Sequence, residues 1–187
     1  MGEMGEPRTA WERTVIPPRT ARLILRQWRP SDLEPFAQLN ADPEVMRFFP
    51  APLSREESDA LAERIRLRIE EAGVGLFALE LRESGEFLGF TGLNPMPEWS
   101  PGSGFLEIGW RLRREAWGRG YATEAALECL RFAGEHGVPE VWSLTARLNI
   151  PSIAVMRRIG LEYVAALDHP DVDGPLKPHV FYRRGLT

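Results

Sequence analysis

Apolar side chains recur along the chain at two spacings, which predict helices in some stretches and strands in others. Residues 23–28 alternate as a first strand does, and the polar pair at 31–32 starts a helix that continues through Leu39. A second helix is expected after Ser54, because Glu57 three positions later completes the spacing of a capping box. The first third of the chain therefore predicts a strand followed by two helices.

Alternating apolar positions then predict three strands in succession. Residues 76–82 and 87–93 flank a turn-forming segment and predict a hairpin, and residues 105–112 predict a third strand after an irregular loop at 94–104. Trp99 in that loop either lines a substrate opening or anchors the loop by packing. The middle of the chain is thus expected to form an antiparallel sheet.

The last third alternates between helix and strand. A helix is expected directly after Gly120, a strand at 141–145, a short helix at 149–159, and closing antiparallel strands at 161–165 and 179–183. The strand, helix and strand around Gly120 should form one parallel crossover. The sequence therefore predicts a single-domain α/β fold with a mixed sheet, antiparallel in its N-terminal half and with one parallel strand-helix-strand crossover.

The stretch WRLRREAWGRGYATEAA, residues 110–126, combines a strand end, a glycine turn and a helix start. Gly118 and Gly120 flank Arg119 and allow main-chain N–H groups to approach a ligand closely. The unpaired amides of the helix's first turn carry about +0.5 charge and point into this turn. The glycines either permit a tight turn alone or form an anion site, and the second alternative predicts a bound phosphate.

Charge favours the anion site. Four arginines lie between positions 111 and 119 of a chain whose net charge is −4. A third glycine is missing at Thr123, so the dinucleotide fingerprint is incomplete, and the chain has no GxxxxGK phosphate loop. Nicotinamide and ATP sites of these two kinds are therefore disfavoured.

Three motifs carry a family resemblance: LEIGWRL, WGRGYATEA and TARLNIPSIAVMRRIGL. In this order they resemble the GNAT superfamily of acetyl-CoA-dependent N-acetyltransferases, closest to the ribosomal-protein N-terminal acetyltransferase (RimJ/RimL-like) branch. The similarity extends from TARLILRQWRPSD to HVFYR, nearly the whole chain. It implies a GNAT-like fold, acetyl-CoA as co-substrate without a metal, and an amine acceptor.

The resemblance also implies where coenzyme A lies. Main-chain groups of Trp110 and Leu112 would bind the pantetheine arm. Arg113 and Arg114 would lie near the phosphates or else remain solvated surface charges. Glu115 stands where the family often has Gln or Arg, which leaves a contact at that position open. The main-chain amides implied to hold the pyrophosphate belong to Gly118, Arg119, Gly120, Tyr121, Ala122 and Thr123.

The segment from Asn149 to Ser152 matches the family's NxxS motif. Asn149 would bond the pantetheine amides, act as a helix N-cap, or do both. Many family members have a tyrosine acid one turn later, where this chain has Met156. Ser152 is therefore the candidate acid for the coenzyme A thiolate, with a plain helix-start serine as the alternative.

Glu107 shares one face of its strand with Gly109 and Arg111. Its carboxylate either accepts a proton from an amine, directly or through water, or pairs with Arg111 or a neighbouring strand. The histidines lack metal-ligand spacing, and His179 is expected to be structural rather than a base. The candidate catalytic residues are thus Glu107 and Ser152.

Composition sets the remaining expectations. Residues 1–19 predict a flexible arm and residues 20–187 the N-acetyltransferase domain. The single cysteine, Cys129, is expected in the core and suits a cytoplasmic protein. Nothing in the sequence indicates nucleic acid or membrane as a partner, and it specifies no oligomeric state. The leading function is acetyl transfer to a primary amine, a protein N-terminal α-amine or a small amine; the alternative is a non-catalytic acyl-CoA-binding sensor or scaffold.

Overall fold

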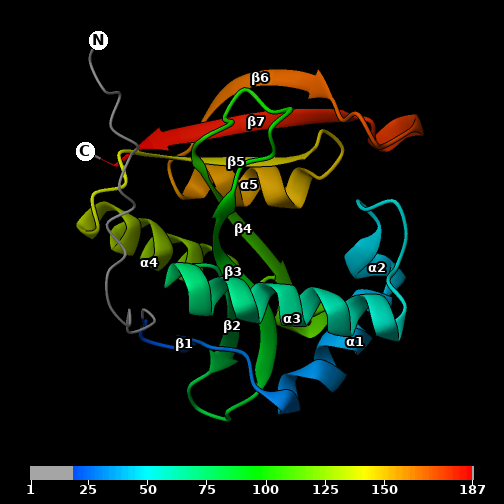
Figure 1. The fold of residues 1–187 in the computed structure, drawn as a ribbon, viewed down its shortest axis with the longest axis vertical. Helices are drawn as coiled ribbons and strands as arrows, with labels where there is room; N and C mark the ends of the chain where they lie inside the picture. The colour runs from blue at the N-terminus through cyan, green and yellow to red at the C-terminus, as the bar shows by residue number, and fades with distance from the viewer. Residues whose placement is uncertain (1–18, 187) are drawn as a thin grey trace.

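The computed structural model describes residues 19–186, and one seven-stranded sheet runs through this part of the chain (Figure 1). The strands are β1 (Leu23–Arg26), β2 (Leu76–Leu81), β3 (Phe87–Pro95), β4 (Leu106–Leu112), β5 (Glu140–Ala146), β6 (Glu162–Asp168) and β7 (Pro178–Gly185). The helices are α1 (Leu33–Ala41), α2 (Pro43–Met46), α3 (Arg55–Ala72), α4 (Tyr121–Glu135) and α5 (Ile150–Arg158). The predicted arm, residues 1–19, lies outside the described residues except for Arg19, which forms an isolated bridge with Ile24.

The strand order is β1-β2-β3-β4-β5-β7-β6. Each neighbouring pair is antiparallel except β4 and β5, which run parallel and are connected through α4. The predicted mixed sheet, antiparallel in its N-terminal half with one parallel crossover, is therefore confirmed.

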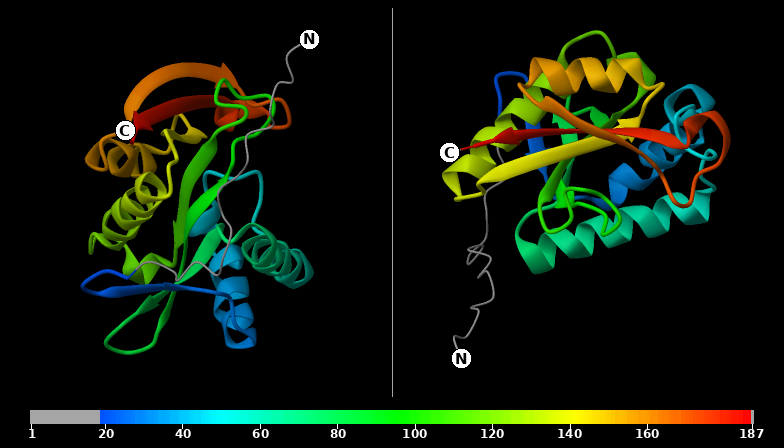
Figure 2. Two further views of the ribbon diagram at one scale, coloured as in Figure 1. Left: turned by 60° about the vertical axis from the view of Figure 1, so that its left-hand side comes forward. Right: turned by 90° about the horizontal axis from the view of Figure 1, so that it is seen from above.

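The helices form two layers over the sheet, with α1 and α3 on one face and α4 and α5 on the other (Figure 2). The predicted capping box is present, since the Ser54 hydroxyl accepts from the Glu57 amide and the Glu57 carboxylate accepts from the Ser54 amide. One stripe of α3, including Ile65 and Ile69, enters the core. Cys129 is buried on α4 as expected, and burial raises the pKa of its thiol.

The first strand and the start of α1 differ from the prediction for a physical reason. β1 ends at Arg26 rather than Trp28, because the Trp28 indole turns into the core and donates to the Leu76 carbonyl at 2.8 Å. Asp32 is buried and does not cap α1 through its side chain; its carboxylate accepts from the Arg26 guanidinium at 2.7 and 2.8 Å. Arg26 also binds Glu80 at 2.6 Å, so a buried ion network joins β1, β2 and the start of α1.

The loop between β3 and β4 covers the outer face of β5 and β7. Met96, Trp142 and Phe181 form a second small core under this loop, and Trp99 packs against it. Gly102 lies so close to the Trp142 ring that a Cβ would come within 2.7 Å of it. Trp99 thus acts as the packing anchor, which was one of its two predicted roles.

Candidate active site

The sheet opens into a gap between β4 and β5. Their parallel ladder contains only the pairs Leu106–Val141 and Glu107–Trp142. Just beyond it, the Ser143 hydroxyl donates to the Ile108 carbonyl at 2.9 Å and takes the place of the next main-chain bond. Past this point the two strands diverge, which leaves main-chain groups of β4 directed into the gap.

The main chain of β4 shows which groups face this gap. The Ile108 carbonyl accepts a hydrogen bond from the Ser143 hydroxyl, and the Leu112 carbonyl accepts one from the Trp117 indole, each at 2.9 Å. Strand residues two apart direct their main-chain groups to the same side, so Trp110 between them also faces the gap. The predicted pantetheine contacts at Trp110 and Leu112 thus lie on its wall, and the carbonyl of Leu112 already accepts one bond.

A cavity of about 1040 Å³ continues from this gap to both faces of the sheet. Its walls come from β4, β5, the start of α4, α5, the segment after α2, and the turn before β7. The predicted site residues that line it are Glu107, Trp110, Leu112, Gly118, Gly120, Tyr121, Ala122, Thr123, Asn149 and Ser152. A ligand in the gap would therefore meet most of the predicted contacts at once.

The glycine turn has the backbone that the sequence predicts for an anion site. Gly118 and Gly120 have φ angles of +72° and +79°, a region that side-chain-bearing residues rarely adopt. Gly120 is the N-cap of α4 and no side chain caps this helix end. The first-turn amides of α4 are therefore directed at the cavity with the positive end of the helix dipole.

Arg22 braces this turn, a role that the sequence analysis missed. Its guanidinium donates to the Arg119 carbonyl at 3.0 Å, pairs with Glu124 at 2.6 Å and lies 4.6 Å from the centre of the Tyr121 ring. Arg22 lies just before β1, about a hundred residues from the glycine turn in the sequence. Only the folded sheet edge brings the two segments together.

Arg113 and Arg114, predicted near the phosphates, and Arg119, predicted to offer its amide, do not line the cavity. Arg113 pairs with Glu86 at 2.5 Å and with Glu115 at 3.1 Å, and Arg114 lies 3.8 Å from Asp42. Arg119 contributes its carbonyl to the bond with Arg22. These contacts match the predicted alternative of surface charges for Arg113 and Arg114, and a phosphate role for the arginines stays a prediction.

Asn149 is the N-cap of α5. Its side-chain oxygen accepts from the Ser152 amide at 3.3 Å, and its amide nitrogen donates to the Thr145 hydroxyl at 3.0 Å. Ser152 is half-buried in the first turn of α5 and faces the cavity. Met156, one turn later, is fully buried. Ser152 is thus the hydroxyl that this helix presents to the cavity.

Glu107 lies where β4 and β5 part. Its carboxylate leans along the strand toward Gly109, with Oε1 3.8 Å from the position that a Cβ on Gly109 would take. Among residues 19–186 it forms no ion pair, so burial alone raises its pKa from 4.5 to about 8. A carboxyl with a pKa near neutrality, facing a large cavity, has the properties of a general base. The predicted alternative, pairing with Arg111, is not found.

Arg111 shares the face of β4 that carries Glu107. It is a cation without a carboxylate partner among the described residues, and burial lowers its pKa to about 10. Its Nη1 donates to the Asn40 side chain at 2.6 Å, and its guanidinium lies 4.2 Å from the centre of the Phe49 ring. The cavity therefore contains a half-buried positive charge, with its Nε fully buried, as well as a neutralised carboxyl.

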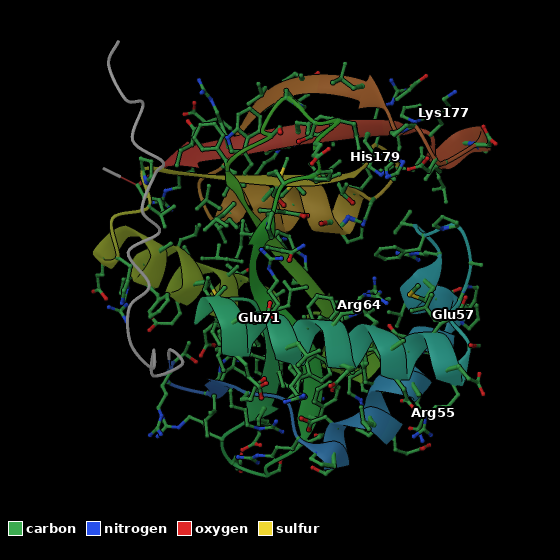
Figure 3. All side chains as sticks on the ribbon, in the orientation of Figure 1. Arg55, Glu57, Arg64, Glu71, Lys177 and His179 are labelled. Atoms are coloured by element: carbon green, nitrogen blue, oxygen red, sulfur yellow. The ribbon has the colours of Figure 1, made fainter. Side chains whose placement is uncertain are left out.

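Two histidines that look unrelated in sequence meet at the far end of the cavity. His169 and His179 line it with ring centres 5.0 Å apart, and His179 lies near the start of β7 beside Lys177 (Figure 3). His179 Nδ1 donates to the Lys177 carbonyl at 3.1 Å, if this nitrogen carries the proton. The pKa of His179 is lowered from its ordinary value, mainly because burial removes water from the ring. The pairing of β6 with β7 brings these rings together, and no local motif signals it.

Within residues 19–186, no cluster of three or more His, Cys, Asp or Glu side chains is arranged to hold a metal ion. In the same part of the chain, no helix combines the length and apolar composition needed to span a bilayer.

Comparison with known proteins shows which family the sequence resembles. The model of the acetyltransferase (GNAT) domain matches residues 22–162. An uncharacterised Bacillus subtilis protein, YkkB, is 31% identical over 129 residues, 68% of this chain and 74% of that protein. The Aspergillus fumigatus FsC-acetyl coenzyme A-N(2)-transacetylase is 34% identical over 151 residues, 78% of this chain and 64% of that enzyme. The chain thus spans less than two thirds of the fungal relative.

The fold is also similar to a solved structure. The RimL ribosomal L7/L12 alpha-N-protein acetyltransferase in complex with coenzyme A superposes with a TM-score of 0.75. The match covers 91% of this chain and 98% of that protein at 17% identity. At this identity, the likeness is one of fold.

Proposed function

The chain belongs to the GNAT family of acetyltransferases, and from that premise we propose that it transfers the acetyl group of acetyl-CoA to a primary amine by direct attack. The observation that carries the proposal is the position of Glu107. Its carboxyl faces the cavity at the point where β4 and β5 part, and that cavity is continuous with the glycine turn. A proton acceptor and a phosphate-type site thus share one space.

The residues present fit coenzyme A. The uncapped first turn of α4 offers amides to a pyrophosphate, and the left-handed Gly118 and Gly120 leave no side chain in the way. The gap between β4 and β5 offers main-chain groups to the amides of the pantetheine arm. Acetyl-CoA bound in this way supplies an activated acyl group as a thioester.

Glu107 would take the proton of the attacking amine, directly or through one water. An α-amine with a pKa near 8 is about 10% neutral at pH 7, so its deprotonation costs only about 1.4 kcal/mol. A base with a pKa of about 8 matches this demand. As nitrogen bonds to the acetyl carbon and the carbon–sulfur bond breaks, the Ser152 hydroxyl would give a proton to the departing thiolate, and main-chain donors at 110–112 would polarise the acetyl carbonyl.

The acceptor class is the finer part of the proposal. The enzyme named RimL acts on a protein α-amine and the fungal relative is named as an N(2)-transacetylase, so both names describe acetylation of an amine. These names support a protein N-terminus or a small amine as acceptor here. We also propose a cytoplasmic location, on the ground that the single cysteine is a buried thiol.

An assay of free thiol release tests the proposal. The protein is incubated with acetyl-CoA and a panel of N-terminal peptides, amino acids and polyamines, and the acetylated products are identified by mass spectrometry. The proposal expects coenzyme A release that depends on an amine. Tight binding of acetyl-CoA with no release above background would instead support an acyl-CoA-binding module.

A further inference from the structure

The proposed mechanism gives Arg111 no role, although its side chain lines the cavity and has no carboxylate partner among the described residues. Its strand neighbours on this face are Gly109 and Glu107, and all three line the same cavity. Among residues 19–186 no carboxylate lies within ion-pair distance of its guanidinium, and its Nε is buried without a hydrogen-bond partner. A partly desolvated charge without a counter-ion, and with a buried N–H that has no acceptor, is costly in a folded protein, which points to a ligand that supplies one.

Packing holds this guanidinium in one orientation. Asn40 is fully buried; it donates to Ser58 at 2.9 Å and accepts from Arg111 Nη1 at 2.6 Å. The rings of Phe49 and Phe90 lie 4.2 and 5.5 Å from the guanidinium carbon. The edge formed by Nε and Nη2, which binds a carboxylate through two parallel hydrogen bonds, therefore has no acceptor in the described protein.

On the basis of the proposed function, we infer that the acceptor is a free α-amino acid whose carboxylate binds Arg111 while its amine faces Glu107. Phe49 is 38% exposed and its ring centre lies 4.2 Å from the guanidinium carbon, so a shift of this exposed side chain would uncover that face of the guanidinium to a ligand. A protein N-terminus carries a neutral carbonyl at this place and leaves the charge uncompensated.

The spacing along β4 is compatible with this acceptor. Glu107 and Arg111 are four residues, or about 13 Å, apart along the strand, and Glu107 Oε1 leans toward Arg111, since it lies 3.8 Å from the position that a Cβ on Gly109 would take. In an α-amino acid the nitrogen and a carboxylate oxygen are about 3 Å apart. With a hydrogen bond of about 2.9 Å at each end, the molecule spans up to about 9 Å, and the remaining distance is within the reach of the Glu107 side chain along the strand.

Matched acceptors that differ only in charge test the inference. Free L-amino acids and their carboxamides are titrated calorimetrically into the full chain saturated with coenzyme A, and the same pairs are used as acceptors in the thiol-release assay. We expect the wild type to bind the acid of at least one pair roughly 10- to 150-fold tighter than its amide. Arg111→Met should reduce that ratio to about one by weakening the acid alone.

Two further variants control the test. Arg131→Gln removes an exposed arginine that pairs with Glu128 and Glu135 on α4, and it should keep the wild-type ratio. Arg111→Lys keeps the charge without the planar fork. It replaces Arg111→Met if thermal melting shows that Arg111→Met is unfolded. The ratio of acid to amide affinity should fall at least fivefold in Arg111→Lys.

The outcomes separate this inference from the proposed function. Equal binding of acid and amide by the wild type, or a ratio unchanged in both Arg111 variants, overturns the inference whether or not acetyl transfer occurs. Acid-selective binding that depends on Arg111, without any coenzyme A release, upholds the carboxylate site and overturns the proposed acetyl transfer.

Discussion

At the scale of single residues, the carboxyl of Glu107 should set how the reaction depends on pH. Its pKa is about 8 because of burial, and only the ionised form accepts a proton, so kcat should rise with pH up to about 8. Glu107→Gln should lower kcat roughly 10- to 1000-fold and remove this acidic limb. Steady-state kinetics from pH 5 to 9, with acetyl-CoA affinity measured in parallel, check the expectation.

Ser152→Ala is the comparison for that experiment, because Ser152 faces the same cavity but is proposed to act on the thiolate. It should lower kcat only about 10-fold and keep the acidic limb. Wild-type kcat in Glu107→Gln at every pH would show that the amine loses its proton to solvent and that Glu107 is structural.

The same carboxyl should also change the stability of the protein with pH. Between pH 4.5 and 8 the folded chain keeps the Glu107 proton while the unfolded chain loses it, so ionisation favours unfolding. The wild type should therefore lose stability across this window relative to Glu107→Gln, by roughly 2–4 kcal/mol, and the difference should be constant above it. Urea unfolding at pH 4.5, 6.5 and 9 measures it, and Glu56→Gln, an exposed change on α3, should show no such divergence.

At the scale of elements, α4 offers a matched pair of glycines for testing the anion site. Gly120 precedes the helix with φ +79° and Gly137 follows it with φ +77°. A Cβ at Gly120 would meet only the Arg22 guanidinium at 3.6 Å, and one at Gly137 would meet nothing within 4 Å. Both substitutions by valine therefore introduce similar backbone strain, and only one of them lies at the helix end that faces the cavity.

Gly120→Val should weaken acetyl-CoA binding at least roughly tenfold, because the added side chain and the displaced backbone disturb charge-assisted amide bonds of about 1.5–3 kcal/mol each. Gly137→Val should lower the stability of the fold about as much as Gly120→Val does, because both glycines have nearly the same φ, and it should leave the affinity for acetyl-CoA unchanged. Calorimetry on the two folded variants checks this. Equal affinities would remove the glycine turn from the binding site.

Elements with a clear local signal could be predicted from the sequence, and the contacts between distant elements could not. The capping box at Ser54 and the glycine turn at Gly118 and Gly120 follow from local chemistry, and the structure has both. By contrast, the sequence predicts no separate helix at α2, because a four-residue helix after Asp42 leaves almost no periodicity. Spacing and local chemistry thus predict the longer helices and the strands, apart from their boundaries, and miss the short α2.

The site divides in the same way. Glu107 and Ser152 could be proposed from strand alternation and from the NxxS motif. The surroundings of Arg111 could not, since they depend on Asn40 and Phe49 from distant segments. The meeting of His169 with His179 and the bracing of the turn by Arg22 also arise only from sheet pairing. Contacts of this kind have no sequence period, so pattern analysis does not reveal them.

At the scale of the whole molecule, acetyl-CoA should join two halves of the sheet that the protein itself connects weakly. In the described part of the chain, two ladder pairs and the hydrogen bond from Ser143 to the Ile108 carbonyl join β4 to β5. Binding at 100 times Kd should stabilise the fold by about 2.7 kcal/mol. Hydrogen exchange should slow most along β4 and β5, and uniform slowing over all strands would show that the ligand does not bind in the gap.

The order of the strands also determines when, during synthesis, the site comes into being. β7 follows every other strand in the sequence, yet it inserts between β5 and β6 and pairs with β5 from Glu140 to Ala146. The glycine turn is therefore synthesised before β7, the strand that supports β5 at the opposite wall of the cavity. We therefore expect a chain that ends before β7 to lack the enclosed cavity even though it contains the glycine turn, and to show no acetyl transfer.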